Sequence, residues 1–566
     1  MNRKLLLLYA LAGPLITPGA AECQAHSHGL PTVDLGYEVH RALSFDETAS
    51  IYNFSNIRYA ESPVGDLRWE APVAPIGRTS GIQDGARGRV CPQGFPDWFA
   101  VTSEFQAAFA KNQASSFNYS LVKGTVESQL ASLTEDPYAT TPYTTEDCLF
   151  LDVITPKKAF DQRDGKKLAP VLVWIHGGAY VTGNKVDGSA GNPSRLITES
   201  QEDGSDGIVY VALNYRLGGL GWLAGREFQA NGGIPNLGLH DQRLALDWVQ
   251  KNIHLFGGDL NRVTVSGGSA GAGSIIHHII ANNGTGKLPF QRAYIESPGW
   301  VPVSSDYQDE AAAALLNNLN VQRISEARKL PSDVIINANA QTVSSAKNTT
   351  FAFGPVVDGE YIPTSPGLAV RDGKFNTDVT ILVSHTSNEG LTFLAPYVTT
   401  DESFTSYLQG LFPSAKPCDI DYIVDELYPL SAFNGSWYDR AISFVGDLGL
   451  KCNAEYLVDA FQKDVFQYEW GVFPAFHGQD FLHVFYDGEG RNRTDGSIIV
   501  AYANAFQSYL GNFVKNGSPN GKGLPRFPVA GSDGEGVFVS EKSIHTVKRD
   551  LVSEGCEWLR TAELWA

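Results

Sequence analysis

The stretch Val263–Gly271, with the sequence VTVSGGSAG, places a serine in the pattern G-x-S-x-G directly after a short apolar run. The apolar run is typical of a buried strand, and the small residues around Ser269 suit a sharp, strained turn from a strand into a helix. Residues 272–280 can continue as that helix, and its N-terminus would favour negative charge close to the serine. We therefore predict that Ser269 is a nucleophile.

Similar apolar runs recur on both sides of this stretch and are separated by helical patterns. Continuous apolar strands that alternate with helices indicate a parallel sheet buried on both faces. Residues 33–59 alternate more between polar and apolar and predict antiparallel edge strands. We find no linker that divides the chain, so the predicted fold class is α/β, one domain with a mostly parallel, mixed sheet. The predicted buried strands are Val171–Ile175, Ile208–Leu213, Val263–Val265, Ala293–Ile295 and Val379–Val383.

The composition excludes several classes of protein. The chain has 566 residues, 43% of them apolar, and a formal charge of −19. An acid excess of this size argues against a nucleic-acid partner, which needs a basic face. No apolar run reaches the ~18 residues that span a bilayer, so stable membrane insertion is not expected. No P-loop, HExxH or CxxC pattern occurs, and Gly219–Ala224 matches a dinucleotide fingerprint only loosely. We expect neither a metal nor an organic cofactor.

The first residues resemble a processing signal rather than part of the fold. Positive charge at Arg3 and Lys4 precedes an apolar run, residues 5–16, and small residues follow up to Ala21. This is the layout of a secretory signal peptide over residues 1–21; an N-terminal core helix is the alternative. A mature domain of residues 22–566 would then be extracellular and open to N-linked glycosylation. The seven candidate acceptors are Asn53, Asn118, Asn283, Asn348, Asn434, Asn492 and Asn516.

A glycine-rich turn follows the predicted strand Val171–Ile175. Its sequence is HGGA, residues 176–179, and it lies some 90 residues before Ser269. Acyl transfer develops negative charge on a carbonyl oxygen, and fixed N–H donors stabilise that charge by several kcal/mol. A turn of this kind is often only structural, but its position favours an oxyanion-binding loop.

A nucleophilic serine near neutral pH needs an imidazole and an orienting carboxylate. His477 follows an apolar run and precedes a glycine, whereas other histidines, including the pair His277 and His278, are predicted to be packing or surface residues. Glu389 lies on the loop after the predicted strand 379–383, with Asp358 as the alternative. The order serine, acid, histidine is the order used by one α/β fold of hydrolases.

Several of these stretches resemble one family. Residues 256–271 are similar to the serine signature of type-B carboxylesterases and lipases, which include the cholinesterases, and residues 146–153 resemble its second signature. Residues 59–69 and 214–218 are also similar to family sequences, and the resemblance runs from about Val33 to at least Phe485. It implies an α/β-hydrolase fold and a secreted fungal member of the family.

The resemblance also implies a mechanism. A triad of Ser269, Glu389 and His477 would hydrolyse a small-molecule ester through an acyl-enzyme. The oxyanion would be bound by the N–H groups of Gly178, Ala179 and Ala270. One departure stands out, because Gly268 occupies the position where the family usually has glutamate. A missing carboxylate there bears on the pH optimum and on the choice of acyl group.

The cysteines are assigned partly by the same resemblance. Cys91 and Cys148 resemble the first disulfide of the family. We expect a second bridge between Cys418 and Cys452, which would leave Cys23 and Cys556 as a remaining pair, although sequence alone cannot fix connectivity.

The segment between Cys91 and Cys148 is rich in aromatic residues. It is either a packed helical excursion or a disulfide-closed flap that offers apolar surface to a substrate. The flap hypothesis predicts a carboxylic-ester hydrolase for apolar or aromatic esters. The alternatives are a lipase with a lid at residues 91–148 and, in another class, an inactive adhesion or binding module. The aromatic residues are Trp98, Phe99, Phe105, Phe109, Phe117, Tyr119, Tyr138 and Tyr143.

Overall fold

The chain is represented by a computed structural model. It describes residues 29–132, 143–186, 192–301, 303–347, 349–461, 465–488, 498–531, 533–549, 552–562 and 564. The predicted signal peptide, Cys23, Asn348, Asn492 and Tyr138 lie outside the described residues.

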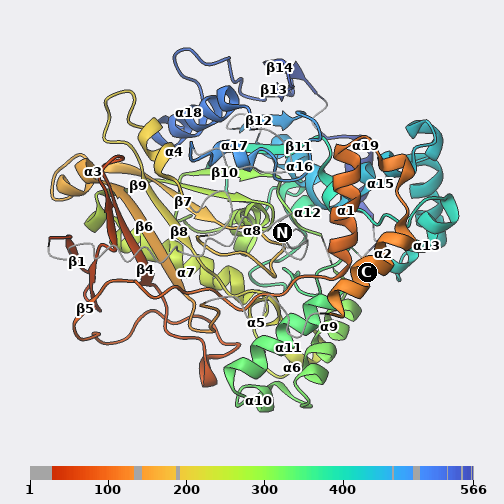
Figure 1. The fold of residues 1–566 in the computed structure, drawn as a ribbon, viewed down its shortest axis with the longest axis horizontal. Coiled ribbons are helices and arrows are strands. Elements are labelled where there is room, and N and C mark those ends of the chain that lie inside the picture. Colours follow the sequence, from red (N-terminus) through yellow and green to blue (C-terminus); the bar gives the residue numbers. More distant parts are fainter. Residues whose placement is uncertain are drawn as a thin grey trace.

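A large mixed sheet forms the centre of the described structure (Figure 1). Its spatial order is β14-β13-β12-β11-β10-β9-β7-β8-β6-β4-β3. Neighbours from β8 through β13 are parallel, and the pairs at both ends of the sheet are antiparallel. The strands are β3 (Ser44–Asp46), β4 (Ile51–Arg58), β6 (Phe150–Pro156), β7 (Ala169–Ile175), β8 (Val209–Leu213), β9 (Gly258–Gly268), β10 (Arg292–Glu296), β11 (Thr380–Thr386), β12 (Val465–Trp470), β13 (Glu535–Val539) and β14 (Ile544–Lys548).

The predicted α/β class with a mostly parallel, mixed sheet is confirmed. Each of the five predicted buried runs lies in one of the strands β7 to β11, to within one residue at its start. The N-terminal part supplies β3 and β4 at one edge, as expected. A second, small sheet, which the sequence did not indicate, is formed by β1 (Thr32–Asp34), β2 (Val39–Arg41) and β5 (Ile82–Gln83).

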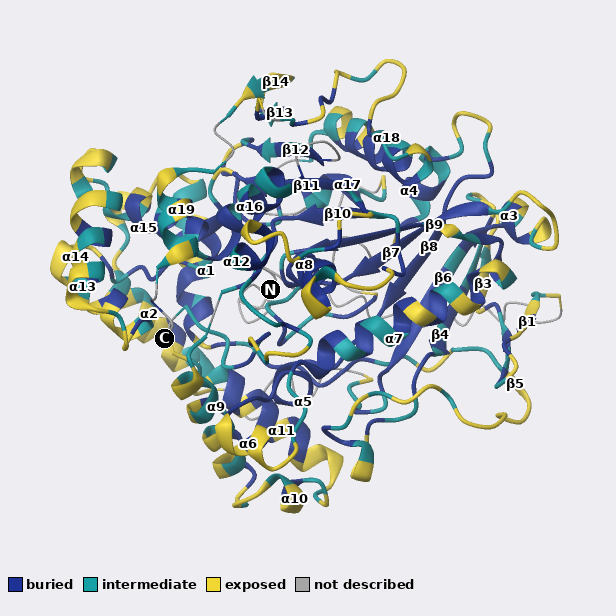
Figure 2. Cartoon of the chain, turned by 180° about the vertical axis from the view of Figure 1, so that it is seen from behind, coloured by how far each residue is buried: buried dark blue, intermediate teal, exposed yellow. Residues whose placement is uncertain are grey.

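Both faces of the central sheet are covered, and this explains its continuous apolar strands. In β7, Val171, Val173 and Ile175 enter one core, whereas Leu172 and Trp174 enter the other. Successive side chains of a strand point to opposite faces, so a strand buried on both sides must be apolar throughout. Figure 2 shows β7 and β8 as buried along their whole length, and β9 is buried over residues 263–268. The first core is closed by α7 (Leu237–Asn252), α8 (Ala270–Gly284) and α16 (Cys452–Phe461), and the second by α4 (Ser194–Glu199) and α18 (Val500–Asn516).

The aromatic segment forms two helices, α1 (Trp98–Ala110) and α2 (Tyr119–Leu130), that pack beside α15 (Trp437–Gly446) (Figure 1). The ring of Phe105 is fully buried and lies 5.1 Å from the ring of Phe117 and 5.4 Å from that of Trp437. These described aromatic residues therefore belong to a packed helical layer. No helix among the described residues is long and apolar enough to cross a membrane.

The remaining helices lie in the segments that connect the strands or follow the last strand. They are α3 (Lys157–Asp161), α5 (Gly218–Gly221), α6 (Arg226–Ala230), α9 (Ser305–Asn318), α10 (Ile324–Ala327), α11 (Ser332–Ser344), α12 (Pro366–Arg371), α13 (Asp401–Leu411), α14 (Pro417–Tyr422), α17 (Phe481–Val484) and α19 (Glu554–Thr561).

The structure contains the expected disulfide between Cys91 and Cys148, but the expected pairing of Cys418 with Cys452 is wrong. Cys452 is bonded to Cys556, and this bond ties α19 to α16. Cys418 lies in α14, is exposed and has no disulfide partner among the described residues. Cys452 and Cys556 are both buried, so the second bridge is set by the docking of the C-terminal helix, which sequence spacing does not reveal.

Candidate active site

The predicted site residues follow four strands of the parallel part of the sheet. Gly178 follows β7, Ser269 follows β9, Glu389 follows β11 and His477 follows β12. Because these strands are parallel, their carboxyl ends lie along one edge of the sheet, where α/β proteins form their ligand sites. The fold therefore places four distant stretches of sequence at one edge.

Ser269 occupies a strained turn between β9 and α8. Its backbone has φ 57° and ψ −124°, a conformation that costs a non-glycine residue of the order of 1–3 kcal/mol. Its N–H donates to the carbonyl oxygen of Glu296 at 2.9 Å. A side chain at Gly271 would place a Cβ 2.1 Å from the carbonyl oxygen of Ile175, so only glycine lets the turn pack against β7.

The glycine-rich turn after β7 lies directly against Ser269. A Cβ on Gly177 would lie 3.0 Å from the Cβ of Ser269 and 2.6 Å from the carbonyl oxygen of Gly268. Gly178 has φ 110° and Ala179 has φ 51°. Across the described part of the chain, the N–H groups of Gly178, Ala179 and Ala270 have no protein acceptor. These three donors, at the turn and at the first position of α8, are therefore free to bind an oxyanion.

His477 and Glu389 are joined by a short hydrogen bond. The Nδ1 atom of His477 lies 2.5 Å from Oε2 of Glu389, and the N–H of Thr386 donates to Oε1 of Glu389 at 2.7 Å. Burial opposes ionisation of Glu389, but the charge and hydrogen bond of His477 and the backbone donor outweigh it. The pKa of Glu389 therefore lies below its ordinary value.

Neighbouring loops hold this pair in place. The N–H of Asn388 donates to the carbonyl oxygen of Ala475 at 3.0 Å, and its side-chain amide donates to that of Pro474 at 2.8 Å. The loops after β11 and β12 are thus bonded side by side, as expected for loops that leave adjacent strands. Only 2% of Glu389 and 3% of His477 is exposed, so water does not compete for their hydrogen bond.

The second ring nitrogen of His477, Nε2, makes no hydrogen bond to a described residue. Nε2 is buried and has no hydrogen-bond partner among the described residues, so the structure contains no hydrogen bond between His477 and the Ser269 hydroxyl. The ring centroid of Phe393 lies 5.0 Å from that of His477, and Phe393 lines the same cavity as Ser269. Phe393 thus packs against the imidazole ring and also lines the cavity that contains Ser269.

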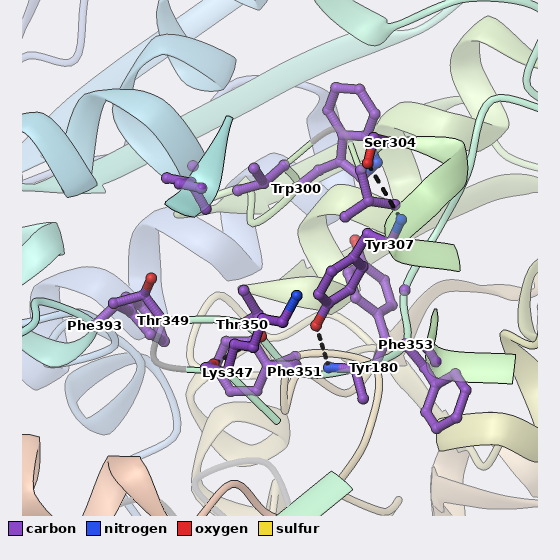
Figure 3. Close-up of a pocket in the computed structure, with 18 of the residues that line it drawn as sticks. Tyr180, Trp300, Ser304, Tyr307, Lys347, Thr349, Thr350, Phe351, Phe353 and Phe393 are labelled. Carbon is purple, nitrogen blue, oxygen red and sulfur yellow. Dashed lines mark hydrogen bonds between the residues drawn. The ribbon is translucent and has the colours of Figure 1, made fainter. Parts of the chain in front are cut away.

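A cavity of about 530 Å³ opens in front of Ser269. Its walls are mainly apolar and include several aromatic side chains, of which Figure 3 shows Trp300, Tyr307 and Phe351. One ion pair, between Lys347 and Glu310, lies among the lining residues and is exposed. The site can therefore hold an uncharged apolar group beside the serine.

The aromatic segment at residues 91–148 does not line this cavity within its described part. Instead it packs behind the lining: the ring of Trp98 lies 5.5 Å from that of Phe351, and the ring of Phe99 lies 6.5 Å from that of Phe393. The sequence analysis missed Trp300 and Phe351. Trp300 offered a signal, because it follows the predicted strand Ala293–Ile295 and so falls at the same edge of the sheet.

The space next to Gly268 is filled by an aromatic ring. A Cβ on Gly268 would lie 2.5 Å from the ring of Phe481, so the chain cannot hold a glutamate there unless that ring moves. The ring of Phe481 thus occupies the space that a carboxylate side chain at this position would need.

The alternative residues have structural partners elsewhere. Asp358 accepts hydrogen bonds from the side-chain amide of Asn236 at 2.7 Å and from the N–H of Ile362 at 2.8 Å, within a turn. The two rings of the histidine pair on α8 are buried, as expected of packing residues, and burial lowers the pKa of both His277 and His278 to about 3.

Comparison with known proteins agrees with this geometry. The chain matches the Carboxylesterase family over residues 40–558. It is 41% identical over 514 residues to carboxylesterase patB of Penicillium expansum, which covers 88% of this chain and 90% of that protein. It is 29% identical over 388 residues to a secreted lipase of Arthroderma benhamiae, which covers 66% of this chain and 72% of that protein. The crystal structure of Aspergillus niger EstA superposes with a TM-score of 0.76 at 23% identity, covering 94% of this chain and 98% of EstA.

The fold is that of the α/β hydrolases. The chain belongs to the carboxylesterase family, and its reaction is the hydrolysis of carboxylic esters. An inactive binding module on the same scaffold has no support in these findings.

Proposed function

We propose that Ser269, His477 and Glu389 form the catalytic triad of this esterase. The Ser269 hydroxyl attacks the ester carbonyl while Nε2 of His477 takes its proton, and Glu389 holds the imidazole in the tautomer that leaves Nε2 free. The alcohol leaves after protonation by His477, and water activated by the same imidazole hydrolyses the acyl-enzyme. The observation that carries this proposal is the buried bond between His477 and Glu389, which leaves Nε2 unpaired.

The oxyanion of each tetrahedral intermediate is bound by the N–H groups of Gly178, Ala179 and Ala270. Fixed donors in a site with little water cost no reorganisation when charge develops, and one such donor typically contributes about 3 kcal/mol to the transition state. Ala270 stands at the N-terminus of α8, so the helix dipole favours the same charge.

The lining of the cavity favours apolar or aromatic esters as substrates. Its aromatic walls provide dispersion and hydrophobic contact to an uncharged group. We infer an esterase for soluble esters rather than a lipase with a lid at residues 91–148, because the described part of that segment packs behind the lining residues.

The substrate proposal predicts the effect of removing one wall of the cavity. Phe351→Ala should raise KM for p-nitrophenyl esters of medium chain length by about tenfold with little change in kcat, since the lost contact is uniform binding worth about 1–2 kcal/mol. Steady-state kinetics over a series of acyl lengths measures this, and the loss should grow with chain length.

The matched control is Phe45→Ala. Phe45 is also half-buried and contacts one ring, that of Tyr52 at 4.8 Å, but it lies on edge strand β3 and does not line the cavity. It should leave KM unchanged. Activity confined to cationic choline esters, or an equal KM in the two variants, would contradict the proposed substrate class.

We propose further that the protein is secreted after loss of residues 1–21 and carries N-linked glycans. The charged, apolar and small residues at its start support this, as does its similarity to the secreted lipase of Arthroderma benhamiae. Of the acceptors that the structure describes, Asn118, Asn283, Asn434 and Asn516 are exposed. N-terminal sequencing of protein from culture medium should begin at Glu22; a start at Met1 would refute the cleavage.

A further inference from the structure

Two buried acidic residues lie close to the proposed triad and have no role in it; the carbonyl oxygen of one, Glu296, accepts the N–H of Ser269 at 2.9 Å. Glu296 is the last residue of β10, and Asp480 follows His477 by three positions in the chain; neither is exposed to solvent. Oδ2 of Asp480 accepts a hydrogen bond from the Tyr468 hydroxyl at 2.8 Å and another from the Ser384 hydroxyl at 3.3 Å. Oδ1 of Asp480 and both carboxyl oxygens of Glu296 have no hydrogen-bond partner among the described residues.

The register of the sheet places Glu296 on the face where Asp480 lies. Glu296 is paired with Gly268 on β9 and with Ser384 on β11. Paired residues of neighbouring parallel strands point to the same face, and Ser384 reaches Asp480 on that face. The Glu296 carboxyl therefore lies one strand away from the position at which Gly268 lacks a side chain.

The charged groups that act on Asp480 and Glu296 are residues of the proposed triad and the other acid of the pair. Among the described residues neither acid forms an ion pair with lysine or arginine; Asp480 is influenced by Glu389 and His477, and Glu296 by Asp480. Burial raises the pKa of Asp480 to about 6, and burial together with Asp480 raises the pKa of Glu296 well above its ordinary value.

Two tyrosines complete the surroundings and remain neutral. The Tyr294 hydroxyl lies 2.8 Å from the Tyr468 hydroxyl, and burial raises the pKa of both well above the ordinary value. Two buried carboxyls without a cation do not both ionise, because each charge opposes the other.

We propose that Glu296 and Asp480 hold one proton between them at neutral pH and act as positioning residues that place a single negative charge behind His477. This inference rests on the proposed function, since His477 must become an imidazolium in the reaction. Glu296 comes from β10 and Asp480 from the loop after β12. Together they supply a negative charge, which the chain cannot place at position 268 because that residue is glycine. A negative charge close to the ring favours the imidazolium that forms when His477 takes the serine proton.

The test is the pH profile of kcat/KM for an isosteric double variant, Glu296→Gln with Asp480→Asn. It removes the charge without changing volume, so the acid limb should move about one unit to lower pH, and kcat at neutral pH should fall about tenfold. Glu296→Gln alone leaves Asp480 ionised and should move the limb much less.

The matched control is Glu38→Gln. Glu38 is also buried and lies 2.9 Å from Nδ1 of His40, but it lies next to β2, in another part of the fold. It should leave the acid limb in place whatever it does to stability. A double variant that folds and keeps the wild-type limb would overturn the inference.

Thermal unfolding gives a second readout. A carboxyl whose pKa is raised in the folded state stabilises the fold below its unfolded pKa and loses that contribution as pH rises toward the folded pKa. Glu296→Gln removes this loss, so its Tm should exceed that of wild type by a margin that grows between about pH 5 and pH 8. A difference in Tm that does not change with pH would also contradict the inference. So would a Glu296→Gln variant that fails to fold, because an amide replaces a protonated acid without adding charge.

Labelling with a fluorophosphonate separates this inference from the proposed function. If wild-type protein is not labelled at Ser269, the proposed triad fails. If wild type and the double variant are both labelled and their pH profiles coincide, the triad stands and only the acid pair fails.

Discussion

Ser269→Ala should reduce kcat for ester hydrolysis by about 10⁶-fold and leave the fold intact. The hydroxyl is the only group in the proposed site that can form the acyl-enzyme, and without it the imidazole has no nucleophile to activate. Nε2 of His477 has no hydrogen-bond partner among the described residues, so removal of the serine hydroxyl breaks no bond to it. Steady-state hydrolysis of p-nitrophenyl butyrate measures the activity, and thermal unfolding measures the fold.

Ser304→Ala is the matched control. Ser304 also lines the cavity, but its hydroxyl accepts from the N–H of Tyr307 at 3.3 Å and caps α9. Its loss should cost about 1 kcal/mol of stability and little activity. Retention of more than a trace of hydrolysis by Ser269→Ala would mean that another residue is the nucleophile.

Glu389→Gln should lower kcat by about 10⁴-fold with little change in KM. The carboxylate accepts the Nδ1 proton of His477, and this fixes the tautomer in which Nε2 can take the serine proton. An amide can donate to Nδ1 instead, which favours the opposite tautomer and removes the charge that stabilises the imidazolium. The size of the side chain is unchanged, so the loss should be in turnover.

Glu469→Gln serves as the control for this variant. Glu469 lies on β12, one residue before the strand ends, and is paired with Arg549 outside the cavity. Its exchange should affect stability and leave kcat within about twofold of wild type, as expected of a charge that does not contact the triad. A Glu389→Gln enzyme within tenfold of wild type would exclude Glu389 as the orienting acid.

The parts of the fold that sequence predicted are those that local chemistry fixes. The strand before Ser269 is apolar because both faces of the sheet are covered. The residues around Ser269 are small because β7 passes within contact distance of the turn. Glu389 and His477 were predicted because each follows an apolar run and because the surrounding residues resemble the acid and histidine sites of the family. In a parallel sheet, the ends of such strands meet at one edge.

The predictions that failed or stayed open depend on how distant segments dock. Cys452 and Cys418 cannot be told apart by spacing, but one lies under the C-terminal helix and the other on the surface. The sequence left open whether the aromatic residues of α1 are packing residues or substrate contacts. In the structure Trp98 of α1 packs behind Phe351, which comes from a loop far along the chain. The ring of Phe481 at Gly268 likewise follows from tertiary packing alone.

The most direct test of the account is to locate the covalent adduct. Purified protein is treated with a fluorophosphonate, digested and mapped by mass spectrometry, with heat-unfolded protein as the control. The account predicts one modified residue, Ser269, in the folded protein, and none after unfolding, because an isolated serine is a poor nucleophile. An adduct on a different residue, or an active enzyme that carries no adduct at all, would contradict it.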